Sequence, residues 1–271
     1  MASYEKYDKV NIWWFPADFC QARYGKYHKS GNNSCTLISL IFANKLSKSS
    51  DFSQNVEELP TRIWNFIGSS INHGNKVYRD RDPKSLNISI PAAILELATH
   101  KTIDFQLVEW FFTQVDVEIE DPFGISEELS GILKTTLKVF QQQDWGVPSH
   151  LFAAIIADCR TVMISFDLNN SIASFFDPHR HGENTGAVFA QATMEDIDNL
   201  MFWYITMMDT SFSSRPEMYE LAFLSSHRDL SEIPSPPFGD LAKDPKKSQP
   251  DAPPKLKPEN FDEFDEEKLK T

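Results

Sequence analysis

Residues 150–179 read HLFAAIIADCRTVMISFDLNNSIASFFDPH, and this stretch decides the fold class. It holds three short apolar runs, which we expect to be strands at 150–157, 161–168 and 172–176. The pair Asn169-Asn170 separates the second run from the third and is a signal for a two-residue hairpin. Because a tight turn joins antiparallel strands, the stretch predicts an antiparallel sheet in the second half of the chain.

Helical patterns dominate the first half of the chain. Apolar spacing and capping signals predict helices at 35–46, at 56–71 with Pro60 in the first turn, at 91–98, at 126–140 with Ser126 as N-cap and Trp145-Gly146 ending it, and at 194–207. Further strands are expected at 10–15, 187–190 and 219–224, with an extended segment at 105–119. Helices followed by an antiparallel sheet are typical of the α+β class.

The composition of the chain changes near Ile233. Eight of the sixteen prolines lie in 234–271, mixed with Lys, Asp and Glu. Such a segment cannot bury enough apolar surface to offset its ordering entropy. We therefore predict one mixed domain at 1–233 and a disordered tail at 234–271. A short docking motif around Phe261 and Phe264 is the alternative interpretation of the tail.

The formal net charge of −13 argues against binding to nucleic acid, because affinity for phosphate backbones comes from clustered Lys and Arg. A basic protein partner fits this charge better. The three cysteines cannot all pair and show no metal-ligand spacing, which favours a reducing compartment. We expect a cytosolic or nuclear protein with no signal peptide, no membrane span and no cofactor, since a phosphate-binding Gly-rich loop is also missing.

Cys35 follows a Gly31-Asn-Asn-Ser34 turn and opens an apolar helical run. Either Asn33 or Ser34 is a candidate N-cap. The free N–H groups and the positive dipole end of a helix start favour a thiolate, which is the nucleophilic form of cysteine. This position predicts a catalytic thiol; the alternative is a small buried core residue.

The triplet Asp177-Pro178-His179 follows the expected hairpin. In an extended chain, residues two apart point to the same side, so Asp177 can orient the imidazole of His179. That imidazole can take the thiol proton and later protonate a leaving amine. His181 continues the alternation and is a competing base. A surface turn is the alternative interpretation of the Asp-x-His pattern.

Three further polar or thiol groups are candidates for a role at this site. Gln21 precedes Cys35 by fourteen residues, and its amide could join the Cys35 N–H in binding an oxyanion. Its alternative is an ordinary surface residue. Cys159, next to Arg160, could be a reactive thiol but more simply marks a turn between two strands. Cys20 is expected to be a buried wall residue.

The order Gln21, Cys35, Asp177-x-His179 resembles the herpesvirus large tegument protein deubiquitinase domain and its cellular relatives. The Gly31–Ser34 turn and the small residues at 186–188 resemble the corresponding parts of that family. The resemblance implies a papain-like cysteine peptidase fold, with a helical first half packed on an antiparallel sheet. It also implies cleavage after the C-terminal glycine of ubiquitin or a ubiquitin-like protein. The order Cys before His argues against enzymes of the SUMO-protease type.

Pro178 departs from the family pattern, which prefers a small polar residue at this position. Proline removes a backbone N–H and could change how His179 is presented. This departure and the acidic, proline-rich tail motivate a second hypothesis. In it, the fold is an inactive protein-binding or scaffold module, whose partner is another protein.

Overall fold

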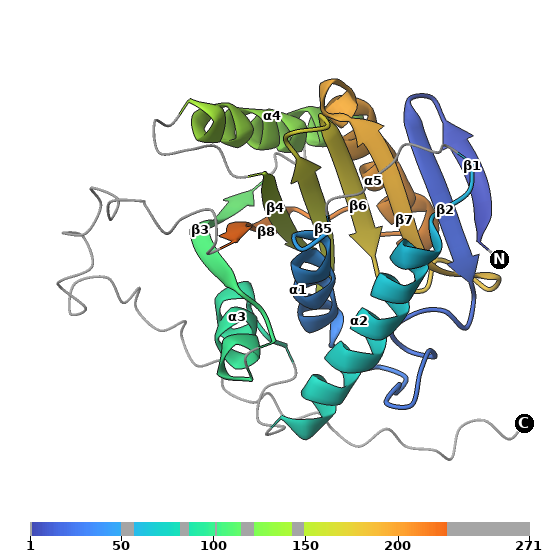
Figure 1. Cartoon of the computed structure of the whole chain (residues 1–271). Coiled ribbons are helices and arrows are strands. Elements are labelled where there is room, and N and C mark those ends of the chain that lie inside the picture. The colour runs from blue at the N-terminus through green and yellow to red at the C-terminus, as the bar shows by residue number, and fades with distance from the viewer. Residues whose placement is uncertain are drawn as a thin grey trace, which may run out of the picture. The chain divides into compact units, whose positions relative to one another are not determined.

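An eight-stranded antiparallel sheet organises the described part of the chain (Figure 1). The computed structural model describes residues 2–49, 57–81, 87–100, 102–114, 122–142 and 149–226. The strand order in the sheet is β1-β2-β7-β6-β5-β4-β8-β3. The strands are β1 Ser3–Tyr7, β2 Val10–Pro16, β3 Phe105–Gln114, β4 His150–Ala157, β5 Arg160–Asp167, β6 Ile172–Asp177, β7 Thr185–Thr193 and β8 Met218–Ser226.

Helices cover both faces of this sheet. One face carries α1 Cys35–Leu46, α2 Thr61–Asp80 and α3 Ile90–Thr99, which share one apolar cluster with the strands. The other face carries α4 Pro122–Gln141 and α5 Ile197–Phe212, the latter preceded by a short 3₁₀ turn at Met194–Asp196. No helix in these described ranges is long and apolar enough to cross a membrane. The predicted α+β class is confirmed.

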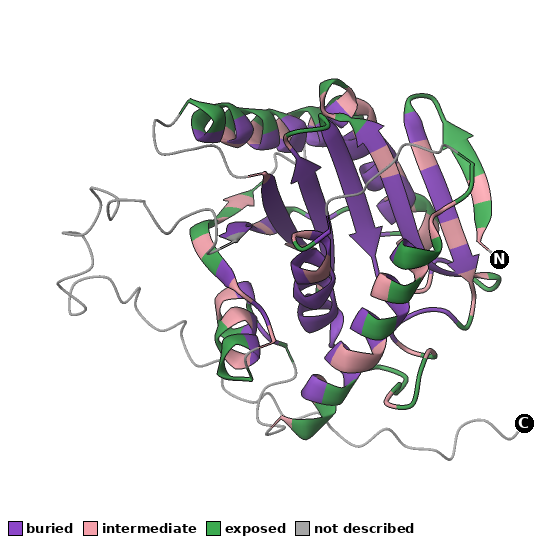
Figure 2. Cartoon of the chain, viewed as in Figure 1, coloured by how far each residue is buried: buried purple, intermediate pink, exposed green. Residues whose placement is uncertain are grey.

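The central strands are buried on both sides, which explains why their sequences are continuous apolar runs (Figure 2). On β4, Leu151 and Ile155 join the cluster under α4 and α5. Their neighbours Phe152 and Ala154 point to the opposite face and join the cluster under α1. The strand predicted at 150–157 is confirmed to the residue.

The turn between β4 and β5 consists of Asp158 and Cys159, both with positive φ, 46° and 60°. Two successive residues in the left-handed region define the type I′ hairpin, whose twist matches that of the strands. The prediction that Cys159 marks a turn is confirmed. The turn matters for function because it places the Cys159 carbonyl against the start of α1.

The connection between β5 and β6 differs from the expected two-residue turn. Asp167 pairs with Ile172, so four residues, 168–171, form the loop. The Asp167 carboxylate accepts hydrogen bonds from the backbone N–H groups of Asn169 and Asn170, both at 3.1 Å. Ser171 completes the turn with φ at 55°. The Asn-Asn signal located the turn correctly, but the side-chain cap of Asp167 made it longer.

Several element ends also differ from the sequence-based expectation. Helix α2 begins at Thr61 after Pro60, which is the N-cap and not a first-turn residue, and it continues to Asp80. Helix α4 begins at Pro122, so Ser126 is inside it and bonds the carbonyl of Phe123 instead of capping. Strand β1 was not predicted, since its polar sequence carries no apolar alternation.

Three expectations fall on residues outside the described ranges. These are the end of α4 at Trp145-Gly146, the part of the extended segment beyond Gln114, and the tail at 234–271. The domain boundary at 233 therefore stays a prediction.

Gly74 on α2 allows this helix to approach α1 closely. A Cβ at Gly74 would lie 2.5 Å from Ile38 Cγ1 and 2.9 Å from the Ile38 backbone N. Gly74→Ala is expected to lower the free energy of unfolding by about 1–3 kcal/mol, because the helix backbone itself must shift. Urea unfolding measures this change.

Gly131 on α4 is the matched control, since a Cβ there meets nothing within 4 Å. Gly131→Ala should raise the free energy of unfolding by about 0.5–1 kcal/mol through helix propensity alone. Equal stabilisation by the two substitutions would contradict the close approach of α1 and α2.

Candidate active site

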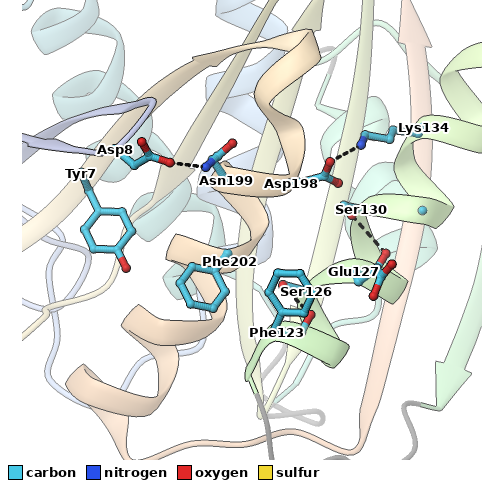
Figure 3. Close-up of a pocket in the computed structure, with 11 residues that line it drawn as sticks. Tyr7, Asp8, Phe123, Ser126, Glu127, Ser130, Lys134, Asp198, Asn199 and Phe202 are labelled. Carbon is cyan, nitrogen blue, oxygen red and sulfur yellow. Dashed lines mark hydrogen bonds and ion pairs between the residues drawn. The ribbon is translucent and has the colours of Figure 1, made fainter.

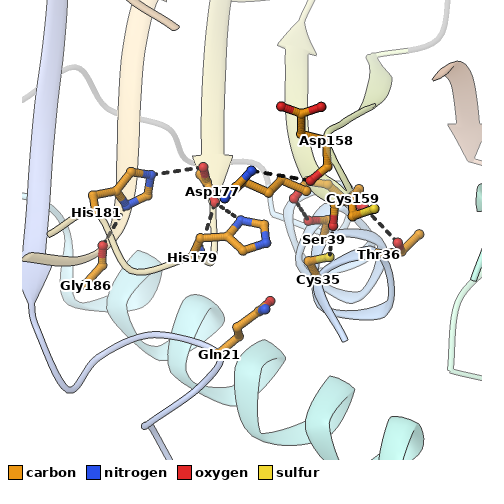
Figure 4. Close-up of polar contacts among 12 residues, drawn as sticks. Gln21, Cys35, Thr36, Ser39, Asp158, Cys159, Asp177, His179, His181 and Gly186 are labelled. Atoms are coloured by element: carbon orange, nitrogen blue, oxygen red, sulfur yellow. Dashed lines mark hydrogen bonds and ion pairs between the residues drawn. The ribbon is translucent and has the colours of Figure 1, made fainter. Parts of the chain in front are cut away.

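Cys35 is the first residue of α1, as the sequence predicted (Figure 4). Ser34 is the N-cap residue, but its side chain makes no capping bond to the helix. The first backbone N–H groups of a helix have no intrahelical partner, so the N–H of Cys35 is available to a ligand. The thiol is 3% exposed and lies 3.8 Å from the carbonyl oxygen of Cys159.

Asp177 and His179 meet at the end of β6. The Asp177 carboxylate is fully buried, and its Oδ1 accepts the His179 ring N–H at Nδ1, 2.5 Å, and the His179 backbone N–H, 2.8 Å. This fixes the tautomer and leaves Nε2 of His179 to face the thiol. Figure 4 shows the His179 ring between Asp177 and Cys35.

The pKa values of the three groups are displaced in the directions that an ion pair requires. Burial raises the pKa of the Cys35 thiol, but the hydrogen bond and charge of His179 outweigh it, so the net change is downward. Burial lowers the pKa of His179, and the charge and hydrogen bond of Asp177 reverse this and raise it to about 10. The pKa of Asp177 is held far below its usual range by the two histidines, against its burial. The arrangement favours a thiolate beside an imidazolium.

His181 lies on the other side of the same carboxylate. Its Nε2 is 3.0 Å from Asp177 Oδ2, and its Nδ1 is 2.8 Å from the carbonyl oxygen of Gly186. The side chain is fully buried. Because both ring nitrogens are engaged away from Cys35, the geometry favours His179 over His181 as the base.

The sequence suggested that Pro178 could change how His179 is presented, but His179 is still bonded to Asp177. The Pro178 carbonyl accepts the backbone N–H of Gln21 at 2.9 Å, so it anchors the loop that carries Gln21. The Gln21 side chain is buried, not a surface residue, and its amide points toward Cys35 and His179 (Figure 4). One N–H of that amide is held by the carbonyl of Asn32 at 3.2 Å, which leaves the second N–H for a substrate oxygen.

Asn75 of α2 is a site residue that the sequence analysis missed. Its Nδ2 donates to the carbonyl of Gln21 at 2.8 Å, and its Oδ1 accepts from Ser34 Oγ at 2.6 Å and from Asn32 Nδ2 at 2.9 Å. It thus ties the Gln21 loop to the turn before Cys35. The available signal was its position, four residues after Ile71, where it places an amide on the buried stripe of the helix.

The other two thiols lie in different surroundings. Cys20 is buried, as expected, and burial raises its pKa. Cys159 is exposed in the β4–β5 turn. The low-pKa thiol and the freely accessible thiol are therefore different residues, which matters for any labelling experiment.

A cavity of about 650 Å³ lies away from these residues (Figure 3). It is formed by the turn after β1, α4 and α5, and Tyr7, Phe123 and Phe202 contribute aromatic rings to it. These helices cover the sheet face opposite to α1. Cys35, His179 and Asp177 are not among the residues that line this cavity, so we assign it no part in the chemistry at Cys35.

Comparison with known proteins identifies no matching family model and no matching curated protein. The similar solved structures include two that are each 14% identical to this chain. The Pseudomonas avirulence protein AvrPphB aligns over 71% of this chain and 92% of its own, with a TM-score of 0.43. The ubiquitin-specific protease of the murine cytomegalovirus tegument protein M48, solved with a ubiquitin-based suicide substrate, aligns over 79% and 84%, with a TM-score of 0.45.

The similarity to a herpesvirus tegument protease is the one that the motifs led us to expect. At this level of identity it carries no statement about activity.

Proposed function

We propose that this chain is a thiol peptidase or isopeptidase in which Cys35, His179 and Asp177 act as a triad. The observation that carries the proposal is the buried Asp177 carboxylate bonded to the His179 ring, with Cys35 at the start of α1 on the other side of that ring (Figure 4). The alternative interpretations, a surface turn for Asp-x-His and a core residue for Cys35, do not explain why a buried carboxylate, an oriented imidazole and a thiol at a helix start lie together.

Each residue has a role that follows from its position. The Cys35 thiolate attacks the carbonyl carbon, and the backbone N–H of Cys35 and the free N–H of Gln21 bind the oxyanion that forms. His179, as imidazolium, gives its proton to the leaving amine, and the thioester remains on Cys35. His179, now neutral, takes a proton from water, which hydrolyses the thioester and restores the thiol. Asp177 orients the ring and stabilises its charged form throughout.

The substrate class proposed is ubiquitin or a ubiquitin-like protein. It comes from the sequence resemblance, and one feature of the site is compatible with it. Because the Cys35 thiol is 3% exposed, a scissile residue without a side chain reaches it most easily. A C-terminal glycine fits this requirement.

The test is a ubiquitin probe with a C-terminal electrophile, followed by mapping of the modified cysteine. The wild type and Cys159→Ser should both form a one-to-one adduct at Cys35. Removing the exposed Cys159 excludes labelling that depends on accessibility alone. An adduct at Cys159 in the wild type, with none at Cys35, would refute the assignment of the nucleophile.

The alternative of an inactive binding module makes the opposite prediction. It requires no adduct and no turnover, with partner binding unaffected by Cys35→Ala. The lowering of the Cys35 pKa by the neighbouring His179 favours the peptidase over this alternative. If the probe binds without reacting, the module hypothesis is preferred.

The pH dependence of kcat/KM should reflect the ion pair. Cys35 must be a thiolate, and its pKa lies below the ordinary value of 9.0. His179 must be charged to protonate the leaving group, and its pKa is raised to about 10. Activity on a small fluorogenic substrate should therefore rise below pH 9 and fall only near pH 10. A fall near pH 6.5, the ordinary histidine value, would mean that His179 is not paired with Asp177.

A further inference from the structure

Asp177 serves two histidines, and a triad needs only one. Its Oδ1 is used by His179, while Oδ2 is held by Nε2 of His181 at 3.0 Å. The His181 ring is held in turn by the Gly186 carbonyl, 2.8 Å from Nδ1. Both partners of His181 are hydrogen-bond acceptors, so its ring can only serve them as a donor.

The Gly186 carbonyl, which holds the His181 ring, belongs to tightly packed backbone. A Cβ at Gly186 would lie 2.2 Å from the carbonyl oxygen of Pro16 and 2.6 Å from that of Phe19. Ala187 N–H also donates to the Phe19 carbonyl at 2.9 Å. The carbonyl that holds His181 therefore belongs to the first part of β7, which packs closely against the end of β2 and the chain that follows it.

We propose that His181 is a positioning residue of this site: by holding Oδ2, it fixes the Asp177 carboxylate in the orientation in which Oδ1 can hold His179. Without this contact the carboxylate can rotate about its χ2 torsion, which is a soft torsion for Asp. His179 then loses its fixed tautomer and part of the stabilisation of its charged form. The inference rests on the proposed function, because a positioning residue implies a catalytic site. Its test measures the His179 titration and Cys35 alkylation, which do not require peptidase activity.

Aromatic side chains from two elements flank His181. Its ring packs against Trp14 of β2, with centroids 5.5 Å apart, and against Phe212 of α5, 5.2 Å apart. Asp177 is the ion-pair partner of His181, Glu5 shares a cavity of about 280 Å³ with it, and Arg160 lies over the Phe212 ring that His181 contacts. Glu5 is itself bonded by Trp14 Nε1 at 2.7 Å.

Two substitutions separate the positioning contact from the bulk of the ring. In His181→Gln, the amide nitrogen stands near the place of Nε2 and can donate to Asp177. In His181→Asn, the amide nitrogen stands near the place of Nδ1 and can reach only Gly186. Both variants remove the imidazole and its charge, so they differ chiefly in the contact to Oδ2. The variants are made in the full chain with Cys159→Ser, and thermal midpoints are recorded.

The first readout is the titration of the His179 ring, followed by NMR of ¹⁵N-labelled histidine. In His181→Asn, the pKa of His179 should fall by about one unit or more, because a nearby carboxylate that turns away no longer favours the charged form. Loss of a positive charge at His181 would by itself move this pKa upward, so the direction separates the two effects. His181→Gln should retain the greater part of the wild-type value.

The second readout is the rate of Cys35 alkylation by iodoacetamide at pH 7. His181→Asn should react more slowly by on the order of tenfold, which is the loss expected from one hydrogen bond to a charged group. His181→Gln should recover most of that rate. Trp14→Phe changes the packing on His181 without touching its hydrogen bonds, so it should lower the thermal midpoint and leave alkylation near the wild-type rate.

An unchanged His179 titration in His181→Asn, or equal losses in His181→Asn and His181→Gln, would overturn the proposal. If His181→Asn does not fold, a His181→Gln variant as damaged as His179→Ala overturns it equally. Neither readout involves cleavage of a peptide bond. A protein that fails to react with the ubiquitin probe but shows these shifts would therefore refute the proposed function and leave the role of His181 standing.

Discussion

Cys35→Ser is expected to abolish turnover, with kcat/KM falling on the order of a millionfold, the loss that follows removal of the nucleophile from a peptidase triad. The serine hydroxyl stays protonated at neutral pH, whereas the Cys35 pKa is lowered by His179. The shorter bond to oxygen also withdraws the nucleophile from the imidazole. The measurement is single-turnover cleavage of a ubiquitin conjugate, with the thermal midpoint recorded because residue 35 is buried.

Cys159→Ser is the matched control for this prediction. It removes an exposed thiol from the turn whose carbonyl contacts Cys35, and it leaves that carbonyl in place. Its turnover should equal that of the wild type. Full activity in Cys35→Ser, or loss of activity in Cys159→Ser alone, would place the nucleophile elsewhere.

His179→Ala is expected to lower kcat by about 10²–10⁴-fold, the usual contribution of a general acid and base. Burial raises the pKa of the Cys35 thiol, and the substitution removes the histidine whose hydrogen bond and charge oppose this effect, so the thiol pKa should rise toward or above its ordinary 9.0. Alkylation at pH 7 should therefore slow together with turnover. A stopped-flow measurement of both rates on the same preparation checks this link.

His100→Ala supplies the control for removing a histidine as such. His100 follows α3, is exposed, and its Nε2 lies 3.4 Å from Glu96 Oε1. Its substitution should leave both rates unchanged. If His179→Ala alkylates as fast as the wild type, the thiol is not activated by this ring, and the triad assignment fails.

The sequence presents His181 as a competing base, whereas the structure places it against Asp177. As a competing base facing away from Cys35, it would have little effect on the rate when replaced. As the partner of Asp177 Oδ2, it is expected to matter, but to be replaceable by Gln. A true base could not be replaced in this way, because an amide does not accept and release a proton at neutral pH.

The sequence by itself determined the parts of the molecule that are governed by local signals. Helix α1 was predicted with its observed bounds, Cys35–Leu46, because a turn, a cap candidate and an apolar run all occur within a few residues. Strand β4 was predicted equally well, because a strand buried on both faces is apolar at every position. The α+β order and the pairing of Asp177 with His179 depend on spacing along the chain, which the sequence states directly.

Only the tertiary structure decided what depends on residues that are distant along the chain. Strand β1 is polar and exists through its pairing with β2, and Asn75 reaches Gln21 across 54 positions of sequence. The alternation that placed Asp177 and His179 together could not place His181. The His181 N–H bonds the Thr185 carbonyl at 3.0 Å across a turn that contains Gly182, with φ at 126°, and the His181 ring meets the second oxygen of Asp177. A backbone in that region is favourable chiefly for glycine. The contact with Asp177 depends on how this turn packs, and the side-chain pattern does not encode it.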